Sequence, residues 1–314
     1  MTLTPEAPAA ATSKAVLFDY RQAANPVRKG LTEPIPEGRW GPELHQRGPS
    51  AILPLDLSAE LGCEGPATSP ALSANFVRIL AGETIDAGAN ATSSLFYVWR
   101  GAGHCLQPAT TPGPDFRQDW RQGDLFVLPA GEAAQLEAYE ESVLYWVHDA
   151  PLLRHLGVRA DRPRFEATYY PGEWLRRELA ALAADPSTAR SNRLSLLLAN
   201  RDLPASRTVT HTLWAMYGLV PAGAVQPPHR HQSVALDLVI ACAPGCATLS
   251  GTELNPDGTI RNPVRMEWEP GAAFVTPPGH WHSHVNDSGQ EALLLPIQDA
   301  GLHTYLRSLD ICFS

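Results

Sequence analysis

The chain reads GAVQPPHRH over residues 223–231 and GAAFVTPPGHWHSHVN over residues 271–286. Because side chains alternate between the two faces of a β-strand, His229 and His231 project to the same side. Imidazole nitrogens that point into one closed space form half of a metal site, and His282 lies where a third ligand is needed. Together the two stretches predict a metal ion held by His229, His231 and His282.

The composition of the chain limits both its expected fold and its expected partners. The 314 residues suit two small domains better than one, and 29 prolines with 24 glycines favour short strands and turns over long helices. A net charge of −9 without a basic run argues against a nucleic-acid partner or an anionic membrane surface. We therefore expect a protein whose partner is a small molecule.

The ends of the chain and its cysteines predict a cytoplasmic protein. The first fourteen residues lack the apolar segment of a signal peptide, and no apolar run reaches the roughly 20 residues needed to cross a bilayer. The five cysteines are scattered without the paired spacing of a zinc site, so we interpret them as buried free thiols in a reducing compartment.

Short apolar runs separated by turn residues predict a β-sandwich or barrel on each side of a helical segment. The expected strands are 75–80, 94–99, 124–129 and 142–147, then 210–220, 236–241, 272–276 and 292–297. Leucines at helical spacing predict a helix over Trp174–Ala184. We divide the chain into an N-terminal arm (1–70), a β domain (71–150), a helical connector (151–205) and a second β domain (206–314).

The two β domains repeat one spacing of turn residues. Gly123, Pro129 and Gly131 are separated by the same intervals as Gly271, Pro277 and Gly279. In each case a turn precedes a strand and a second turn follows it. A duplicated β domain is the natural inference.

Both halves resemble the cupin superfamily, whose motifs are G-x5-H-x-H-x3/4-E-x6-G and G-x5-P-x-G-x2-H-x3-N. The second half matches the second motif at every fixed position, namely Gly271, Pro277, Gly279, His282 and Asn286. It matches the first motif at Gly223, His229 and His231, while Ala235 and Leu236 occupy the two places of the glutamate. The resemblance implies an all-β bicupin of two jelly-roll barrels.

The first half keeps the cupin frame but not its ligands. Gly82 and Gly101 hold the first-motif frame, while Gly88, Asn90 and Ser94 stand at the places of the histidines and the glutamate, and Ala134 replaces the second-motif histidine. We therefore expect residues 206–314 to bind the metal and residues 71–150 to form a cupin without metal ligands.

Residues 213–223, 228–233 and 276–284 resemble the metal-bearing barrel of gentisate 1,2-dioxygenases and their salicylate and hydroxynaphthoate relatives. These enzymes are bicupins that lack the first-motif glutamate. The resemblance implies Fe(II) held by three histidines, dioxygen as co-substrate, and ring opening of a hydroxylated aromatic acid, amino- and nitro-substituted acids included. Three neutral imidazoles leave the metal dicationic, which favours a bidentate anionic ligand.

Two further residues are candidates for the catalytic site. His284 lies two residues beyond His282, so strand alternation turns it towards the same interior. In the resembling enzymes a histidine at this place lies near substrate or oxygen, which implies proton transfer or a hydrogen bond to dioxygen. A packing role is the alternative.

Asp237 is the second candidate, because it faces inward if one unbroken strand runs on from His231. The gentisate-type enzymes place an arginine there that pairs with the substrate carboxylate, and a buried acid would repel that group. Asp237 thus indicates altered substrate choice: a ring with an amino or extra hydroxyl group, or one held elsewhere by Arg230 or Arg265. The alternative is an acid bonded to a neighbouring strand or paired with an arginine.

These observations lead to one preferred function and two alternatives. We expect an Fe(II)-dependent ring-cleaving dioxygenase that assembles as a homodimer or homotetramer through swapped arms. A metal-dependent isomerase or lyase using Mn, Ni or Zn remains open, because cupins host those reactions too. So does a non-enzymatic cupin that binds a metal and a small ligand.

Overall fold

The computed structural model describes residues 14–110, 114–191 and 193–314. The expectation about a signal peptide falls mainly on residues 1–13, outside the described residues. Within the described part, no helix is long and apolar enough to cross a membrane. The five cysteines are free, but only Cys105 and Cys246 are buried as expected; Cys63 is exposed, and Cys242 and Cys312 are half-buried.

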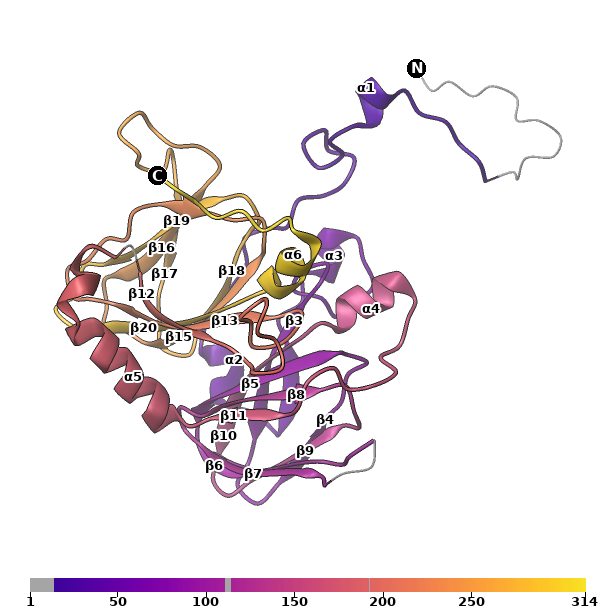
Figure 1. Ribbon diagram of the computed structural model, residues 1–314, viewed down its shortest axis with the longest axis vertical. Helices are drawn as coiled ribbons and strands as arrows, with labels where there is room; N and C mark the ends of the chain where they lie inside the picture. The colour runs from indigo at the N-terminus through magenta and orange to yellow at the C-terminus, as the bar shows by residue number, and fades with distance from the viewer. Residues whose placement is uncertain (1–13, 111–113, 192) are drawn as a thin grey trace.

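The first β unit consists of two antiparallel sheets. Its strands are β2 (Ala51–Pro54), β3 (Ser73–Ile79), β4 (Thr84–Ala87), β5 (Ser93–Arg100), β6 (Ala102–Gln107), β7 (Phe116–Arg121), β8 (Leu125–Pro129), β9 (Ala134–Ala138), β10 (Ser142–His148) and β11 (Thr168–Tyr170). One sheet has the order β11-β8-β5-β10-β3-β2 and the other the order β4-β9-β6-β7 (Figure 1). The all-β prediction is confirmed.

The second β unit repeats this arrangement. Its strands are β1 (Arg39–Trp40), β12 (Leu194–Leu198), β13 (Trp214–Val220), β14 (His229–Arg230), β15 (Ala235–Ala241), β16 (Cys246–Gly251), β17 (Val264–Glu267), β18 (Ala273–Thr276), β19 (Trp281–Asn286), β20 (Ala292–Gln298) and β21 (Cys312–Phe313). A six-stranded sheet, β1-β18-β15-β20-β13-β12, faces a five-stranded sheet, β17-β16-β19-β14-β21.

Each unit ends in a short helix, and the aspartate before that helix accepts a hydrogen bond from the backbone of the same unit. These helices are α4 (Ala150–Leu156) and α6 (Ala300–Leu306). Asp149 accepts from the backbone N–H of Thr92 at 2.7 Å, and Asp299 accepts from that of Val234 at 2.9 Å. The duplication therefore extends to the contact that closes each unit.

The arm and the connector each contribute to both units. The arm carries α1 (Tyr20–Ala23), α2 (Glu43–Gln46) and α3 (Ser58–Leu61), and the connector carries α5 (Gly172–Ala184) and the 3-10 helix η1 (Pro186–Arg190). In the arm, β1 pairs with β18 and β2 with β3, while in the connector β11 pairs with β8 and β12 with β13. Both segments thus hold the two units together.

The two six-stranded sheets pack face to face, and a shared apolar core lies between them. Tyr97 and Tyr145 of the first unit and Tyr217 of the second are buried in this core. Leu236 and Leu238 of β15 point into it. Because strand residues alternate, Ala235, Asp237 and Val239 point the other way, into the second unit.

The interiors of the two units differ in polarity. The first is filled by apolar side chains that include Phe96, Phe126, Leu136 and Trp146. The second has a smaller apolar cluster, which is Val220, Val239, Cys246, Met266, Trp268, Phe274, Ala292 and Leu294. The rest of that interior is polar, which is costly unless each group finds a partner or has a function.

Candidate metal centre

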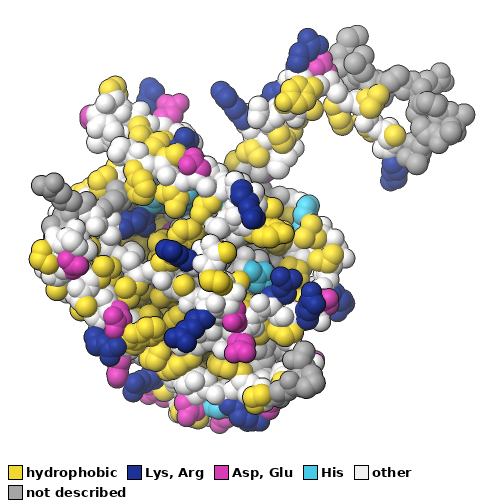
Figure 2. Space-filling model, viewed as in Figure 1, with side chains coloured by type: hydrophobic (Ala, Val, Ile, Leu, Met, Phe, Trp, Pro, Cys, Tyr) yellow, Lys and Arg dark blue, Asp and Glu magenta, His cyan; other side chains and the backbone are white. Residues whose placement is uncertain are grey.

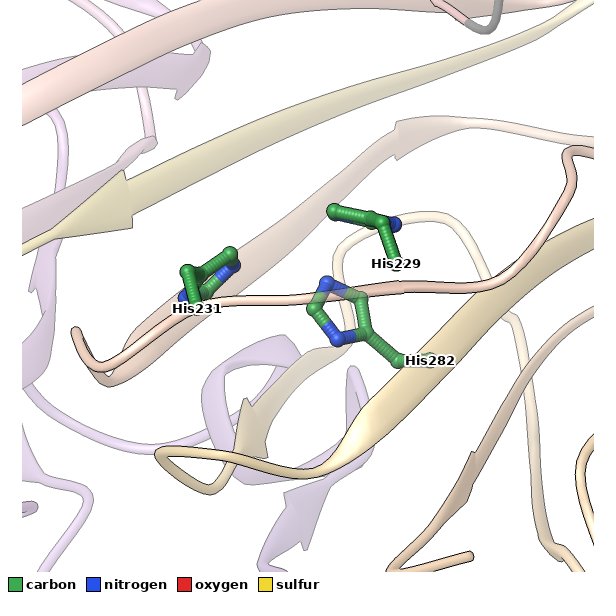
Figure 3. Close-up of side chains that lie close together, drawn as sticks. All are labelled: His229, His231 and His282. Atoms are coloured by element: carbon green, nitrogen blue, oxygen red, sulfur yellow. The ribbon is translucent and has the colours of Figure 1, made fainter. Parts of the chain in front are cut away.

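The three predicted ligands lie together in the interior of the second unit. His229 of β14 is directly opposite His282 of β19 in the antiparallel register, and His231 follows on the same chain segment (Figure 3). One nitrogen from each ring lies within 4.8 Å of the others, and all three residues are buried. The ring centroids of His229 and His282 are 3.9 Å apart, and those of His231 and His282 are 4.9 Å apart.

The chain does not continue as one strand from His231 to Asp237, so that assumption was wrong. β14 ends at Arg230 and β15 begins at Ala235 in the opposite sheet, because the chain crosses between the two sheets there. The carbonyl of His231 accepts from the N–H of Gly279 at 2.7 Å, which fixes the crossing. Asp237 nevertheless faces the interior, since it lies on the inner face of β15.

Hydrogen bonds orient the ligand rings. Nδ1 of His231 lies 2.9 Å from the carbonyl oxygen of Ser233, and Nδ1 of His282 lies 3.1 Å from that of His280. A carbonyl can only accept, so each Nδ1 carries the proton and each Nε2 presents a lone pair to the interior. These are the tautomers that metal binding through Nε2 requires.

The electrostatic surroundings keep the rings neutral. Burial, with a smaller contribution from the positive charge of Arg193, lowers the pKa of His231 to about 4 despite its hydrogen bond to Ser233. Burial, with neighbouring cationic and histidine groups, holds the pKa values of His229 and His282 well below the ordinary range. Neutral imidazole is the form that binds metal, so at neutral pH the rings have the protonation state that metal binding requires.

His284 is held in the opposite tautomer. Trp268 Nε1 donates to the hydroxyl oxygen of Thr248 at 2.9 Å, and the same hydroxyl lies 2.9 Å from Nδ1 of His284. The Thr248 proton has no other acceptor among the described residues, so it is donated to Nδ1, and His284 carries its own proton on Nε2. His284 therefore presents a donor and not a lone pair.

Arg193 is the residue that the sequence analysis missed. It precedes β12, and its Nη2 lies 2.5 Å from Nε2 and 3.2 Å from Nδ1 of His229. Its Nε is buried without a hydrogen-bond partner in the described chain. Burial lowers the pKa of Arg193 to about 10, while Asp237 opposes that shift. The only sequence signal was a single charge before the apolar run 194–198.

Polar side chains of the opposite sheet complete the wall of the site. Ser233 donates to Oε1 of Gln298 at 2.9 Å, and the amide nitrogen of Gln298 lies 3.4 Å from Nε2 of His231. Thr276 donates to Oδ2 of Asp237 at 3.2 Å. Burial raises the pKa of Asp237 to about 7, against the opposing effects of Arg193 and Thr276.

Arg230 and Arg265 were suggested above as residues that could hold the substrate, but neither lies in this interior. Arg230 is exposed and stacks on Trp281, 5.1 Å from the ring centroid. Arg265 is exposed on the outer sheet and pairs with Glu267 at 2.6 Å. That part of the hypothesis was wrong, because both residues point away from the histidines.

The donor set fits a divalent transition metal. Three buried neutral imidazoles suit iron, zinc, copper or nickel, and the described cluster contains no carboxylate ligand. Ala235 offers only a methyl group at the place of the cupin glutamate. In the first unit, the space beside Ala134 and Ser94 is a cavity of only about 20 Å³.

Two facing sheets in each half, with a histidine cluster in one half, define a bicupin. The solved salicylate 1,2-dioxygenase from Pseudaminobacter salicylatoxidans superposes with a TM-score of 0.69 at 16% identity, covering 89% of this chain and 88% of that one. Its gentisate adduct superposes with a TM-score of 0.68 at 15% identity, covering 90% and 86%. The chain therefore has the bicupin fold.

Its curated relatives are 1,2-dioxygenases. Gentisate 1,2-dioxygenase 1 of Aquipseudomonas alcaligenes is 33% identical over 98 residues, 31% of this chain and 25% of the relative. 1-Hydroxy-2-naphthoate 1,2-dioxygenase of Nocardioides sp. (strain KP7) is 29% identical over 197 residues, which are 59% of this chain and 45% of the relative. 5-Aminosalicylate 1,2-dioxygenase of Comamonas sp. is 26% identical over 118 residues, which are 38% of this chain and 29% of the relative. The matches span less than half the length of each relative, and no family model matches the chain.

Proposed function

We propose that this protein is an Fe(II)-dependent dioxygenase that opens the ring of a hydroxylated aromatic acid, with His229, His231 and His282 as the metal ligands. The observation that carries this proposal is the set of three neutral imidazoles beside the half-buried Arg193, whose Nε is buried without a partner in the described chain. Iron in this site supplies the redox chemistry by which both atoms of dioxygen enter the product, so no external reductant is needed. Similarity to the three 1,2-dioxygenases supports the reaction class.

Arg193 and His284 have separate roles in this proposal. Arg193 has an unpaired buried N–H and a positive charge, so it binds the carboxylate of the acid and positions the ring beside the histidines. His284 presents its Nε2–H, which stabilises negative charge that develops near the metal and supplies a proton there. Asp237 is the third group that faces the substrate.

The reaction is tested by reconstitution without oxygen. Metal-free protein is loaded with Fe(II) under anaerobic conditions, and oxygen uptake is recorded with gentisate, salicylate, 1-hydroxy-2-naphthoate and aminosalicylates. Uptake that consumes one oxygen per ring opened supports the proposal. No uptake with any aromatic acid contradicts it, and turnover without oxygen by the Mn, Ni or Zn form would favour an isomerase or lyase.

The ligand assignment is tested independently of turnover. His282→Ala should lose metal binding, because two imidazoles remain where three are needed, as measured by metal content after dialysis. Ala134→His in the first unit is the matched control and should leave the metal content unchanged. Full metal content in His282→Ala would contradict the assignment.

We also propose a homodimer or homotetramer that acts in the cytoplasm. Five free thiols suit a reducing compartment. The arm exposes the apolar side chains Val16, Leu17, Phe18, Tyr20, Val27 and Leu31, and Figure 2 shows hydrophobic side chains along this projecting segment. Exposed apolar groups in such a number indicate a contact with another chain.

A further inference from the structure

The apolar core that the two units share is not filled where α5 runs beside it. α5 follows β11 of the first unit and precedes β12 of the second, so it spans the side of both six-stranded sheets (Figure 1). Its Leu175 and Leu179 are buried in the shared core. Ala180, Ala183 and Ala184 carry only methyl groups, and a cavity of about 490 Å³ remains between them and the second unit.

This cavity adjoins another of about 380 Å³, and the two form one space that we call the inter-unit groove. Both are lined by Arg176, Tyr217 and Leu293. Tyr97 and Trp99 of the first unit line the smaller cavity, so the groove reaches both units. Tyr217 faces the shared core and not the interior that holds the histidines. The groove is therefore separate from the metal centre, and its size suits a small organic molecule.

Polar groups without further protein partners gather where the two cavities meet. Arg176 forms no hydrogen bond or ion pair with another described residue. Its Nη1 lies over the turn before β8, where an added Cβ on Gly123 would be 2.6 Å away. Among the described residues, the hydroxyl groups of Tyr97 and Tyr217 pair only with each other, and these side chains are 2% and 1% exposed. One hydroxyl donates to the other, which leaves one buried O–H without an acceptor.

The charges of the groove are arranged for one anionic group. Burial raises the pKa of both Tyr97 and Tyr217, so each hydroxyl keeps its proton at neutral pH. Arg176 opposes that shift in both tyrosines, because its positive charge is close to both hydroxyl groups. Glu291 lines only the larger cavity. The junction of the cavities therefore attracts an anion, while the larger cavity repels a second one.

We propose that the inter-unit groove binds a monocarboxylic acid with an apolar body, its carboxylate at Arg176 and the tyrosine pair. The apolar body lies along Leu179, Leu219 and Leu293, which line the larger cavity. A carboxylate accepts from both a guanidinium group and a phenol, and hydrogen bonds to charged groups are the strong ones. Because no group at this site is a metal ligand, binding here does not depend on the proposed dioxygenase activity.

The experiment compares ligands that differ in the charge of the head group and in the apolar body. Binding of octanoate, 2-naphthoate and 1-octanol to the full chain is measured by calorimetry without oxygen, before and after loading with Fe(II). We expect octanoate or 2-naphthoate to bind about tenfold or more tightly than 1-octanol, because the alcohol lacks the charge. The tighter of the two acids shows whether the groove prefers a chain or a ring. The affinity should be the same with and without Fe(II).

Variants of α5 assign the binding to the groove. Arg176→Gln should lower the affinity about tenfold, because the head group loses its cation. Arg177→Gln is the matched control, since this neighbouring arginine pairs with Glu178 and does not line the groove, and it should bind like wild type. Ala180→Phe should abolish binding by filling the larger cavity, whereas Ala181→Phe places the same ring outside the groove.

Each of several results would overturn the proposal. These are equal affinities for octanoate and 1-octanol, an unchanged affinity in Arg176→Gln, or an equal loss in Arg177→Gln. Binding of the acids only after Fe(II) loading would place them at the metal centre instead. No binding, together with a smaller assembly in Ala180→Phe by light scattering, would show that a second copy of the chain covers the groove. Arg176 is exposed, so its variant keeps the proposal testable if Ala180→Phe does not fold.

Discussion

His231 and His284 show how hydrogen bonds set the chemistry of otherwise identical side chains. A backbone carbonyl fixes the proton of His231 on Nδ1, while the hydroxyl of Thr248 fixes that of His284 on Nε2. One ring thus offers a lone pair and the other an N–H to the same interior. The position of His284 could be predicted from strand alternation, but its tautomer could not, since Thr248 and Trp268 are distant in sequence.

Thr248→Val should release His284 from this tautomer. Valine has the same shape but no hydroxyl, so Nδ1 loses its donor and the Nδ1–H form becomes populated. The measurement is the pair of imidazole ¹⁵N shifts of His284 in metal-free protein. Thr248→Ser should retain the wild-type shifts, and unchanged shifts in Thr248→Val would show that Thr248 does not set the tautomer.

Asp237 should also give the protein a pH-dependent stability. Its folded pKa of about 7 lies above the ordinary value of 3.8, so ionisation destabilises the fold as pH rises through that interval. Asp237→Asn removes this cost, and its free energy of unfolding relative to wild type should rise from pH 4 to 7 and level off above 7.

The slope of that difference is at most about 1.4 kcal/mol per pH unit. It is measured by urea unfolding of the metal-free proteins at a series of pH values. A difference that stays constant with pH would show that Asp237 has an ordinary pKa in the folded protein.

At the scale of elements, most strands could be predicted from the sequence, but the place where the chain crosses from one sheet to the other could not. The expected strand 142–147 is β10 (Ser142–His148), and the expected helix 174–184 is part of α5 (Gly172–Ala184). Apolar alternation marks such elements because packing on one face decides them. The break at 231–234 carries no such pattern, and Arg193 depends on a pairing of β12 with β13 that no local sequence encodes.

Gly271, in the turn before β18, should be needed for contact between the units. Its φ is +84°, and an added Cβ would lie 2.7 Å from the ring of Trp99 in the first unit. Gly258 has the same φ with open space around it, so Gly258→Ala measures the backbone cost alone.

Gly271→Ala should therefore lower the free energy of unfolding by about 1–3 kcal/mol more than Gly258→Ala, since the Trp99 ring must move. Urea unfolding of both variants gives the difference. Equal losses would mean that the contact between Gly271 and Trp99 adjusts freely.

At the scale of the whole molecule, the arm should control assembly. Deletion of residues 1–34 removes the exposed apolar side chains of the arm and leaves β1, which pairs with β18. We expect a smaller assembly than the full chain gives, measured by light scattering during gel filtration. Replacing Leu17 and Phe18 with serine should act in the same direction, and an unchanged mass in both would exclude the arm as the contact.

Because the interior of the first unit is filled by apolar side chains, the two units should tolerate different amino-acid substitutions. In the first interior, around Phe96, Phe126 and Trp146, any side chain of suitable volume and hydrophobicity can be accepted. In the second interior, the identity of each atom matters, because a histidine, threonine or aspartate cannot be exchanged for a group of equal size. A saturation library should record this contrast as broad tolerance in one half and near-invariance at matching positions of the other. Two units with the same fold would then differ in which substitutions they tolerate.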